Sequence, residues 1–205
     1  MPRVFSIAVA DANGGCKILA AENDLMSFNY FQRGSVQEFL GFFIKTAVER
    51  TQRGMRQKIE EQQMYVGHVY VRGDGLAGVI VTDIEYPTRS AFTIVNKILD
   101  EFSAKFPKSQ FAIMDPANTS SVYPELKEQL VKYQDPHEAD PLLRVQRDLD
   151  ETKIVLVSGL IHKTMESLLN RGEVLDDLVQ RSDQLSSQSK MFYKTAKSTN
   201  SCCTY

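Results

Sequence analysis

The sequence predicts an α+β protein in which an antiparallel sheet flanked by helices is followed by a long helical segment. In residues 1–133 strand-like and helix-like patterns alternate, whereas residues 142–201 contain no proline and repeat their apolar residues at helical spacing. Residues 134–141, QDPHEADP, carry two prolines and several charged side chains, a composition typical of a linker. We therefore expect a domain at 1–133, a linker at 134–141, a helical segment at 142–201 and a short tail at 202–205.

Composition and charge limit the kinds of partner. The 205 residues are 42% hydrophobic and 24% charged, as in ordinary globular proteins, and the formal net charge is -2. This charge provides no basic surface for nucleic acid, so we expect no nucleic-acid binding. The first residues lack the apolar run of a signal peptide, and no segment approaches the roughly 18 apolar residues of a membrane span. The sequence therefore predicts a protein that starts in the cytosol.

The strands of the first domain are predicted from alternating apolar residues. Val4–Asp11 and Cys16–Ala21 flank the turn-forming ANGG and predict a β-hairpin. Residues 64–71 and Leu76–Asp83 flank RGDG and predict a second hairpin, in which RGD is only part of a turn. A weaker strand is expected near Arg56–Glu61. Together these strands predict one antiparallel sheet.

Three helices are predicted in the same domain. Ser35, followed three residues later by Glu38, has the pattern of a capping box and predicts a helix from Ser35 to about Arg53. Thr88 is expected to cap a second helix, and Tyr123–Tyr133 is a shorter helical candidate. The apolar face of the first helix is expected to contain Val36, Leu40, Phe43 and Ala47.

The C-terminal segment carries an apolar seam with one charged member. Steps of three and four residues, the spacing of a coiled-coil seam, place Arg171 on it. A buried guanidinium is costly unless acceptors meet it, the alternative being a misfit whose charged head reaches solvent. The other seam positions are Ile161, Thr164, Leu168, Leu175, Leu178, Ser182, Leu185, Ser189, Phe192, Ala196 and Thr199.

The seam is interrupted upstream. Its earlier part consists of Leu142, Val145, Leu149, Thr152 and Leu156, and the five residues 157–161, VSGLI, put this part out of phase with the rest. A bulge at Ser158–Gly159 would restore the phase, and an insertion or an artefact of the gene sequence is the alternative. A helix with so narrow an apolar stripe is predicted to stay disordered until it meets partner helices.

The residues around Arg171, LLNRGEVLDDLVQRSDQLSSQSKMFYKTA, resemble the arginine-bearing SNARE motif of the synaptobrevin-like type. The stretches QRGSVQEFL, HVYVRGDGLAGVIVTDIEYPTRSAFTIVNKILDEF and QDPHEADPLLRVQRDLDETKI resemble the longin domain and linker of the lipid-anchored class of these SNAREs, which lacks a transmembrane helix. The resemblance covers nearly the whole chain. It implies a profilin-like fold, with five antiparallel strands, one helix on one face and two on the other.

The resemblance also implies a function. It indicates an R-SNARE of vesicle-mediated transport and membrane fusion in the secretory and endosomal pathways, which forms a parallel four-helix bundle with three Q-SNARE helices. In that bundle Arg171 would meet three glutamines, whose side-chain carbonyls can accept its forked donors. SNARE-disassembly and tethering machinery would be further partners. The expected location is the cytosol and the cytoplasmic faces of Golgi, ER-derived vesicle and endosomal or vacuolar membranes.

The first predicted helix has a special aromatic pair. At about 100° per residue, Phe42 points roughly 130° away from the centre of the apolar face, and Phe39 lies at its edge. A core on that face cannot use Phe42, so it is either a singly exposed aromatic or a docking point. The family resemblance implies that Phe39 and Phe42 receive the folded-back SNARE motif and hold it inactive.

The tail NSCCTY is the expected membrane anchor. The resemblance implies lipids on Cys202 and Cys203, a prenyl group and a palmitate. Relatives carry three residues after the cysteine pair, whereas here only Thr204 and Tyr205 follow, and a terminal tyrosine suits prenyl transferases poorly. Which cysteine bears which lipid therefore stays open, as does a divergent end without lipid.

No catalytic site, cofactor site or metal site is predicted. The three histidines are scattered, and none of the common catalytic or phosphate-binding motifs occurs. The alternatives to a fusion protein are a self-acylating or acyl-transferring longin protein and a non-fusogenic coiled-coil adaptor. For acyl transfer the candidate nucleophile Cys16 has no visible base.

Overall fold

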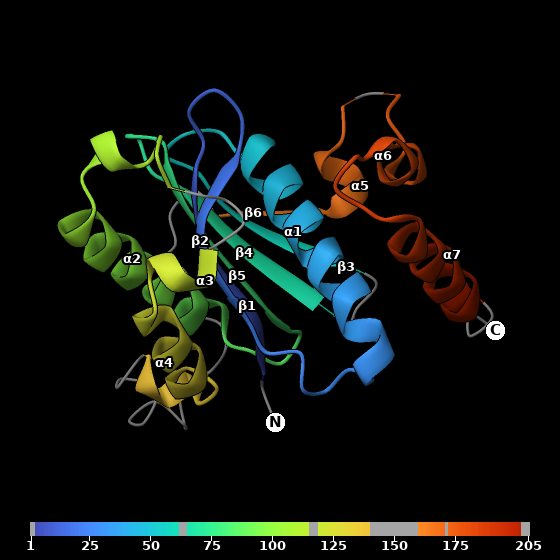
Figure 1. The fold of residues 1–205 in the computed structure, drawn as a ribbon, viewed down its shortest axis with the longest axis horizontal. Helices are drawn as coiled ribbons and strands as arrows, with labels where there is room; N and C mark the ends of the chain where they lie inside the picture. Colours follow the sequence, from blue (N-terminus) through green and yellow to red (C-terminus); the bar gives the residue numbers. More distant parts are fainter. Residues whose placement is uncertain (1–2, 62–64, 115–118, 140–159, 171, 202–205) are drawn as a thin grey trace.

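The computed structural model describes residues 3–61, 65–114, 119–139, 160–170 and 172–201 of the 205-residue chain. Its centre is a six-stranded sheet in the order β2-β1-β5-β4-β3-β6, with helices on both faces (Figure 1). The strands are β1 Val4–Asp11, β2 Lys17–Asn23, β3 Arg56–Glu61, β4 Tyr65–Val71, β5 Leu76–Asp83 and β6 Leu160–Thr164. The predicted α+β class and both predicted hairpins are confirmed.

The sheet differs from the prediction by its sixth strand. The first five strands pair antiparallel, as expected, but β6 pairs parallel to β3, with Arg56 opposite Leu160 and Ile59 opposite Lys163. The expected five-stranded sheet is therefore extended by a strand from the C-terminal segment. Leu160 and Ile161, which belong to the out-of-phase stretch VSGLI, are part of this strand, while residues 157–159 lie outside the described residues.

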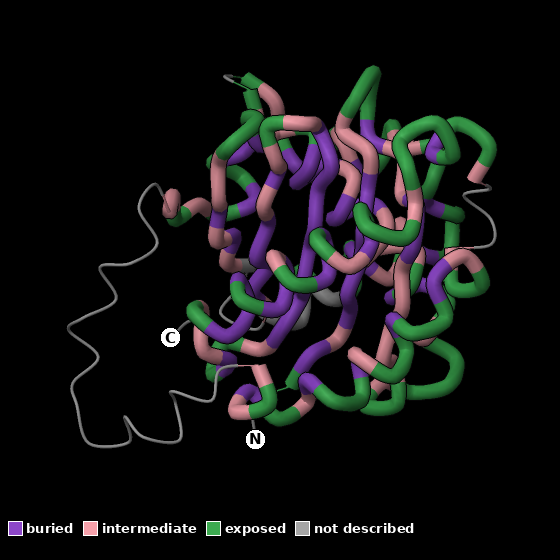
Figure 2. Tube along the Cα trace, turned by 90° about the vertical axis from the view of Figure 1, so that its left-hand side faces the viewer, coloured by how far each residue is buried: buried purple, intermediate pink, exposed green. Residues whose placement is uncertain are grey.

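Two hydrophobic cores lie on opposite faces of the sheet. One core joins the sheet to α2 and α4, and Val4, Ile7 and Val9 of β1 point into it. The other joins the sheet to α1 and to the C-terminal helices, and Ala8 and Ala10 of β1 belong to it. In Figure 2 the buried residues run through the centre of the molecule, and the outer turns are more exposed. The helices are α1 Arg33–Glu49, α2 Thr88–Lys105, α3 Thr119–Val122, α4 Glu125–Lys132, α5 Met165–Leu168, α6 Leu175–Arg181 and α7 Ser187–Ser201, with 3-10 turns η1 Tyr30–Gln32, η2 Lys108–Gln110 and η4 Pro136–Glu138.

The predicted helix starts need correction. The α1 helix begins at Arg33 after Gln32, which makes no side-chain capping hydrogen bond, so Ser35 and Glu38 are not a capping box. Both residues lie inside the helix, and the Glu38 carboxylate is used by the C-terminal segment instead. At α2 the cap position is Pro87 rather than Thr88, which is the first helical residue.

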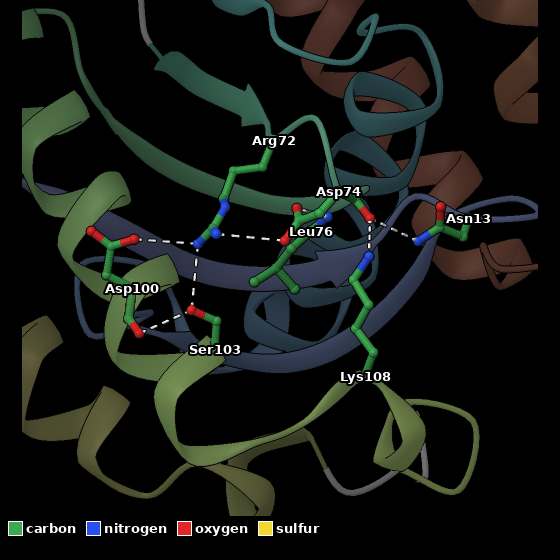
Figure 3. A network of polar contacts seen from close by, with 7 residues as sticks. All are labelled: Asn13, Arg72, Asp74, Leu76, Asp100, Ser103 and Lys108. Carbon is green, nitrogen blue, oxygen red and sulfur yellow. Dashed lines mark hydrogen bonds and ion pairs between the residues drawn. The ribbon is translucent and has the colours of Figure 1, made fainter.

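The ends of the domain are tied down by local polar contacts. In the turn between β4 and β5, Arg72 forms ion pairs with Asp100 of α2 at 3.2 Å and with Asp74 at 3.5 Å (Figure 3). The Asp74 carbonyl accepts a hydrogen bond from Lys108 at 2.5 Å. The RGD sequence is thus part of a turn, as predicted, and the structure shows that this turn is fixed against α2. At the other end, Gln134 bonds with its side chain to the backbone of Val4.

Candidate functional site

The C-terminal segment lies folded against the face of the domain that carries α1. Its strand β6 extends the sheet beside β3, and its last helix α7 contacts α1 (Figure 1). Between them lie α5 and α6, so the described residues of this segment, 160–170 and 172–201, form a strand and three separate helices. The expectation that this segment is disordered until it meets partner helices is wrong for its described part. We call the contact of residues 160–201 with α1 and β3 the closed interface.

Phe42 belongs to the buried cluster that joins α1 to the C-terminal segment. Its side chain is only 6% exposed, so it is not a singly exposed aromatic. It belongs to the same buried cluster as Phe43, whose ring packs against the backbone of Gly67 in β4. The C-terminal segment contributes to this cluster the buried side chains Met165, Leu168, Leu175, Val179, Leu185 and Tyr193. Phe39 is half-buried at its edge, where it stacks on Tyr193 with ring centroids 5.5 Å apart.

Most of the described seam positions are removed from solvent in this closed interface. Leu168, Leu175, Leu185 and Ser189 are buried, whereas Ile161, Leu178, Ser182 and Phe192 are half-buried. Thr164 is exposed and caps a helix instead. It forms a capping box with Ser167 at the start of α5, the Ser167 amide donating to the Thr164 hydroxyl at 3.2 Å and the Thr164 amide to the Ser167 hydroxyl at 2.9 Å.

Several predicted site residues cannot be placed. Arg171 and the cysteines Cys202 and Cys203 lie outside the described residues, as do the side chains of Ala196 and Thr199. Conversely, Met165, Val179 and Tyr193 belong to the closed interface but were absent from the predicted seam. A signal for two of them was present, since Met165 precedes Leu168 by three residues and Val179 follows Leu175 by four, which puts each pair on one helical face.

Glu38 is the main polar contact between α1 and the C-terminal segment. One of its carboxylate oxygens accepts hydrogen bonds from the Ser186 amide and from the Ser189 hydroxyl, both at 2.7 Å. Burial alone would raise the pKa of Glu38, but these hydrogen bonds outweigh it and lower the pKa below its usual value. The ionised carboxylate of Glu38 therefore holds the start of α7 against α1.

A second polar contact lies at the other end of α1. The Arg50 guanidinium, directly after α1, donates to both carboxylate oxygens of Glu173, at 3.2 and 2.9 Å. Glu173 also accepts a hydrogen bond from the Asn170 amide at 2.8 Å, and this bond and the contact with Arg50 lower its pKa. Both side chains of the ion pair are partly exposed, so the pair orients the segment more than it stabilises it.

Asp176 connects two helices inside the C-terminal segment. It lies in α6 and accepts hydrogen bonds from Lys197 at 2.7 Å and from the Tyr193 hydroxyl at 2.8 Å, both in α7. These partners lower the pKa of Asp176. The Tyr193 ring is thereby fixed between Asp176 and Phe39, and α6 and α7 are held in one arrangement against α1.

The candidate nucleophile Cys16 and the histidine His68 both lie in the interior of the domain. Cys16 is buried, and burial raises its pKa to about 12, so its thiol is not ionised at neutral pH. His68 is buried in β4, and burial lowers its pKa to about 3. Within the described ranges, no group of three or more histidine, cysteine or acidic side chains is arranged to hold a metal ion, and no helix is long and apolar enough to cross a membrane.

Comparison with known proteins agrees with the two parts of the chain. Residues 25–129 match the longin family, described as a regulated-SNARE-like domain, and residues 142–203 match the synaptobrevin family. The chain is 55% identical to the "Synaptobrevin homolog ykt6" of Schizosaccharomyces pombe, over 91% of this chain and 90% of the relative. It is 47% identical to the "Synaptobrevin homolog YKT6" of Saccharomyces cerevisiae, over 98% of each chain. The chain therefore belongs to the longin-domain, synaptobrevin-like R-SNAREs, a family of vesicle trafficking.

Proposed function

We propose that this R-SNARE drives membrane fusion by forming a parallel four-helix bundle with three Q-SNARE helices, and that its longin domain holds the SNARE motif inactive in the closed interface. One observation carries the proposal. Leu168, Leu175 and Leu185, which a bundle would bury at its seam, are buried against the α1 face of the longin domain. The same side chains cannot face both partners, so the closed interface and the bundle exclude each other.

The conformation of the motif supports the same conclusion. A SNARE bundle needs one continuous helix, whereas residues 160–164 form a strand and the following residues form three short helices. Assembly must therefore release β6 from β3 and α7 from α1 before the helix can form. If only a fraction f of molecules is open, the apparent dissociation constant for the partner helices rises by 1/f. By keeping most molecules closed, the longin domain would thus weaken the apparent affinity of the SNARE motif for its partner helices.

Arg171 and the tail complete the proposed cycle. In the bundle Arg171 would meet one glutamine from each partner helix, and this polar layer would fix the register of the four helices. Lipids on Cys202 and Cys203 would hold the open protein on the cytoplasmic face of secretory or endosomal membranes. Zippering of the bundle would then draw two bilayers together, and disassembly machinery would return the chain to its closed form.

The proposal is tested by disturbing the buried cluster that joins α1 to the C-terminal segment. Phe42→Glu puts a charge into the apolar contact between α1 and the C-terminal segment, where its burial is unfavourable. We expect a larger radius of gyration in small-angle scattering and faster association with a preassembled complex of three glutamine-bearing helices. Val131→Glu is the matched control, because Val131 is 69% exposed on α4, on the opposite face of the sheet.

Folding of the longin domain must be checked in the same samples. Hydrogen exchange of the β1 and β5 amides, which lie in the middle of the sheet, reports this directly. If Phe42→Glu disturbs these strands, Phe42→Ser is used instead. A variant with protected β1 and β5 but with unchanged scattering and unchanged association rate would contradict the proposed inhibition.

A further inference from the structure

The segment between β2 and α1 displays three large apolar side chains to solvent. Met26 is 77% exposed, Tyr30 75% and Phe31 80%, all within six residues of sequence. Large apolar side chains exposed singly are common, but a group of them indicates a contact surface. The other strongly exposed apolar side chains of the described residues are isolated in the sequence: Ile84, Ile113, Val131, Val174 and Met191.

This segment is held rigidly rather than left as a loose loop. Phe28 packs on Phe5 of β1 with ring centroids 5.9 Å apart, and its carbonyl accepts a hydrogen bond from Arg33 at 3.1 Å. The Asn29 side chain caps the turn η1 by accepting from the Phe31 amide at 3.3 Å. Because these contacts fix the inner side of the segment, the exposure of its aromatic rings does not result from a loose backbone. The exposure is therefore a built feature of the surface.

The exposed side chains form one group. The rings of Tyr30 and Phe31 meet edge to face with centroids 5.7 Å apart. The Arg33 guanidinium lies 5.9 Å from the Tyr30 ring centre, and Arg33 and Met26 line the same shallow hollow. We call Met26, Tyr30 and Phe31 the aromatic tip. In Figure 1 it belongs to the blue segment that leads into the lower end of α1, at the same end of the molecule as the N-terminus.

We propose that the aromatic tip inserts into the interfacial zone of a lipid bilayer, and that it does so without help from anionic lipid. Tyrosine, phenylalanine and methionine combine apolar area with polarisable or hydroxyl groups, which suits the boundary between headgroups and acyl chains. The charges around the tip are not basic overall, since the one cation Arg33 is accompanied in the hollow by the two carboxylates of Glu22 and Asp24. Electrostatic attraction to an acidic surface is therefore not the source of binding.

The position of the chain end favours a membrane over a second protein. Helix α7 packs on the first half of α1 through Glu38 and Phe39, and η1 directly precedes α1. Helix α7 ends at Ser201, and the cysteine pair Cys202 and Cys203 follows immediately. A lipid on this tail would bring the same end of the molecule to the bilayer. This step rests on the proposed function, whereas insertion of the tip itself does not need the lipid.

The tip would also supply a second membrane signal. A single acyl chain holds a protein only marginally, with a partition constant of about 10⁴ M⁻¹, so stable attachment needs a further contribution. An aromatic contact from the folded domain would then orient the closed protein on the membrane before the SNARE motif is released.

The test uses tryptophan fluorescence, because the chain contains no tryptophan. Phe31→Trp is made in the full chain with Cys202 and Cys203 replaced by serine, so that no lipid can be attached. With vesicles of pure phosphatidylcholine we expect a blue shift of the Trp emission and quenching by brominated acyl chains. Val131→Trp is the control, because this position is 69% exposed on α4, and it should show neither change.

The outcomes are distinct. Adding Met26→Ser and Tyr30→Ser to Phe31→Trp should lower the partition constant at least tenfold while scattering and hydrogen exchange stay unchanged. Absence of quenching at position 31, equal quenching at position 131, or binding only to anionic vesicles would overturn the proposal. A blue shift caused by the three partner helices without vesicles would show a protein interface instead. None of these measurements depends on opening of the closed interface, so failure here leaves the proposed inhibition standing.

Discussion

The rings of Phe39 and Tyr193 stack with their centroids 5.5 Å apart and their planes inclined by 17°. This contact joins α1 of the longin domain to α7 of the SNARE motif, 154 residues further along the chain. It lies beside the cluster around Phe42 and beside the hydrogen bonds of Glu38. The stack is thus a direct aromatic contact between α1 and α7, and its loss should favour the release of α7.

The stack should be visible as a coupling energy. We expect Phe39→Ala and Tyr193→Ala to favour the open form, with a coupling of about 0.5–1.5 kcal/mol beyond the area buried. The free energy of opening is measured from hydrogen exchange of α7 amides in a double-mutant cycle. Tyr193→Phe is the control, because it keeps the ring and removes only the hydroxyl bond to Asp176. Strictly additive effects of the two alanines would show that the stack contributes nothing of its own.

Acid should weaken the closed interface. The pKa of Glu38 is lower in the closed form than its usual value of 4.5, because the hydrogen bonds from Ser186 and Ser189 outweigh the effect of burial. A carboxyl with a lowered pKa stabilises the closed form above its open-state pKa, and this stability is lost as pH falls through the closed-state pKa. We therefore expect opening to increase below about pH 4.5, as measured by fluorescence energy transfer between α1 and α7.

The control for this pH dependence is Glu38→Gln. The amide keeps an acceptor oxygen for Ser186 and Ser189 but does not titrate in this range. Glu173 and Asp176, whose pKa values are also lowered, keep their part of the acid response in this variant. Glu38→Gln should therefore open more readily at neutral pH and change less on acidification. An unaltered pH profile would remove Glu38 from the account.

Arg171→Ala should impair assembly and leave the longin domain folded. In the proposed bundle it would leave three buried glutamines without their donor, and an unsatisfied buried polar group costs about 1–3 kcal/mol. Thermal unfolding of the assembled complex and the rate of vesicle fusion measure the effect. Arg171→Gln combined with a glutamine-to-arginine change in one partner helix should restore both. Parent-like assembly by Arg171→Ala would show that the arginine does not form the polar layer.

The tail should carry lipid in the membrane-bound protein. We expect at least one of Cys202 and Cys203 to be modified, because the resemblance to the lipid-anchored class of these SNAREs implies lipids on this cysteine pair. Intact mass spectrometry of protein from its own cells identifies each attached group by its mass. Replacing both cysteines by serine should reduce the membrane-bound fraction, because the aromatic tip alone would hold the protein on a bilayer more weakly than the tip and a lipid together. An unmodified tail in membrane-bound protein would contradict the expected anchor.

Elements with a complete local pattern could be predicted from the sequence. The strands β1, β2, β4 and β5 have alternating apolar residues and turn sequences between them, and α2 has a regular apolar stripe. These features depend on neighbours in the sequence, so they appear at the expected places. The predicted start of α1 was wrong. Ser35 and Glu38 have the spacing of a capping box, but Glu38 instead accepts a hydrogen bond from the Ser186 amide, 148 residues away.

The C-terminal segment shows what local patterns leave out. Its seam spacing predicted one helix, but the open edge of β3 offers backbone hydrogen bonds to residues 160–164, which form a strand there. Phe42 appeared unsuited to any core because its helix was considered against the sheet alone. It shares a buried cluster with Leu168 and Leu175, which come from a segment whose position could not be deduced from spacing. The same seam residues thus suit two different structures.

The most direct test of the closed interface is a distance measured in the free protein and again in the complex. Nitroxide labels are attached at Gln37→Cys on the exposed side of α1 and at Lys194→Cys on the exposed side of α7, with Cys202 and Cys203 replaced by serine and Cys16 left buried. Double electron-electron resonance should give a short, narrow distance distribution in the free protein. Addition of the three glutamine-bearing helices should lengthen and broaden it. A long, broad distribution before the helices are added, or a short one that persists in the assembled bundle, would contradict the account.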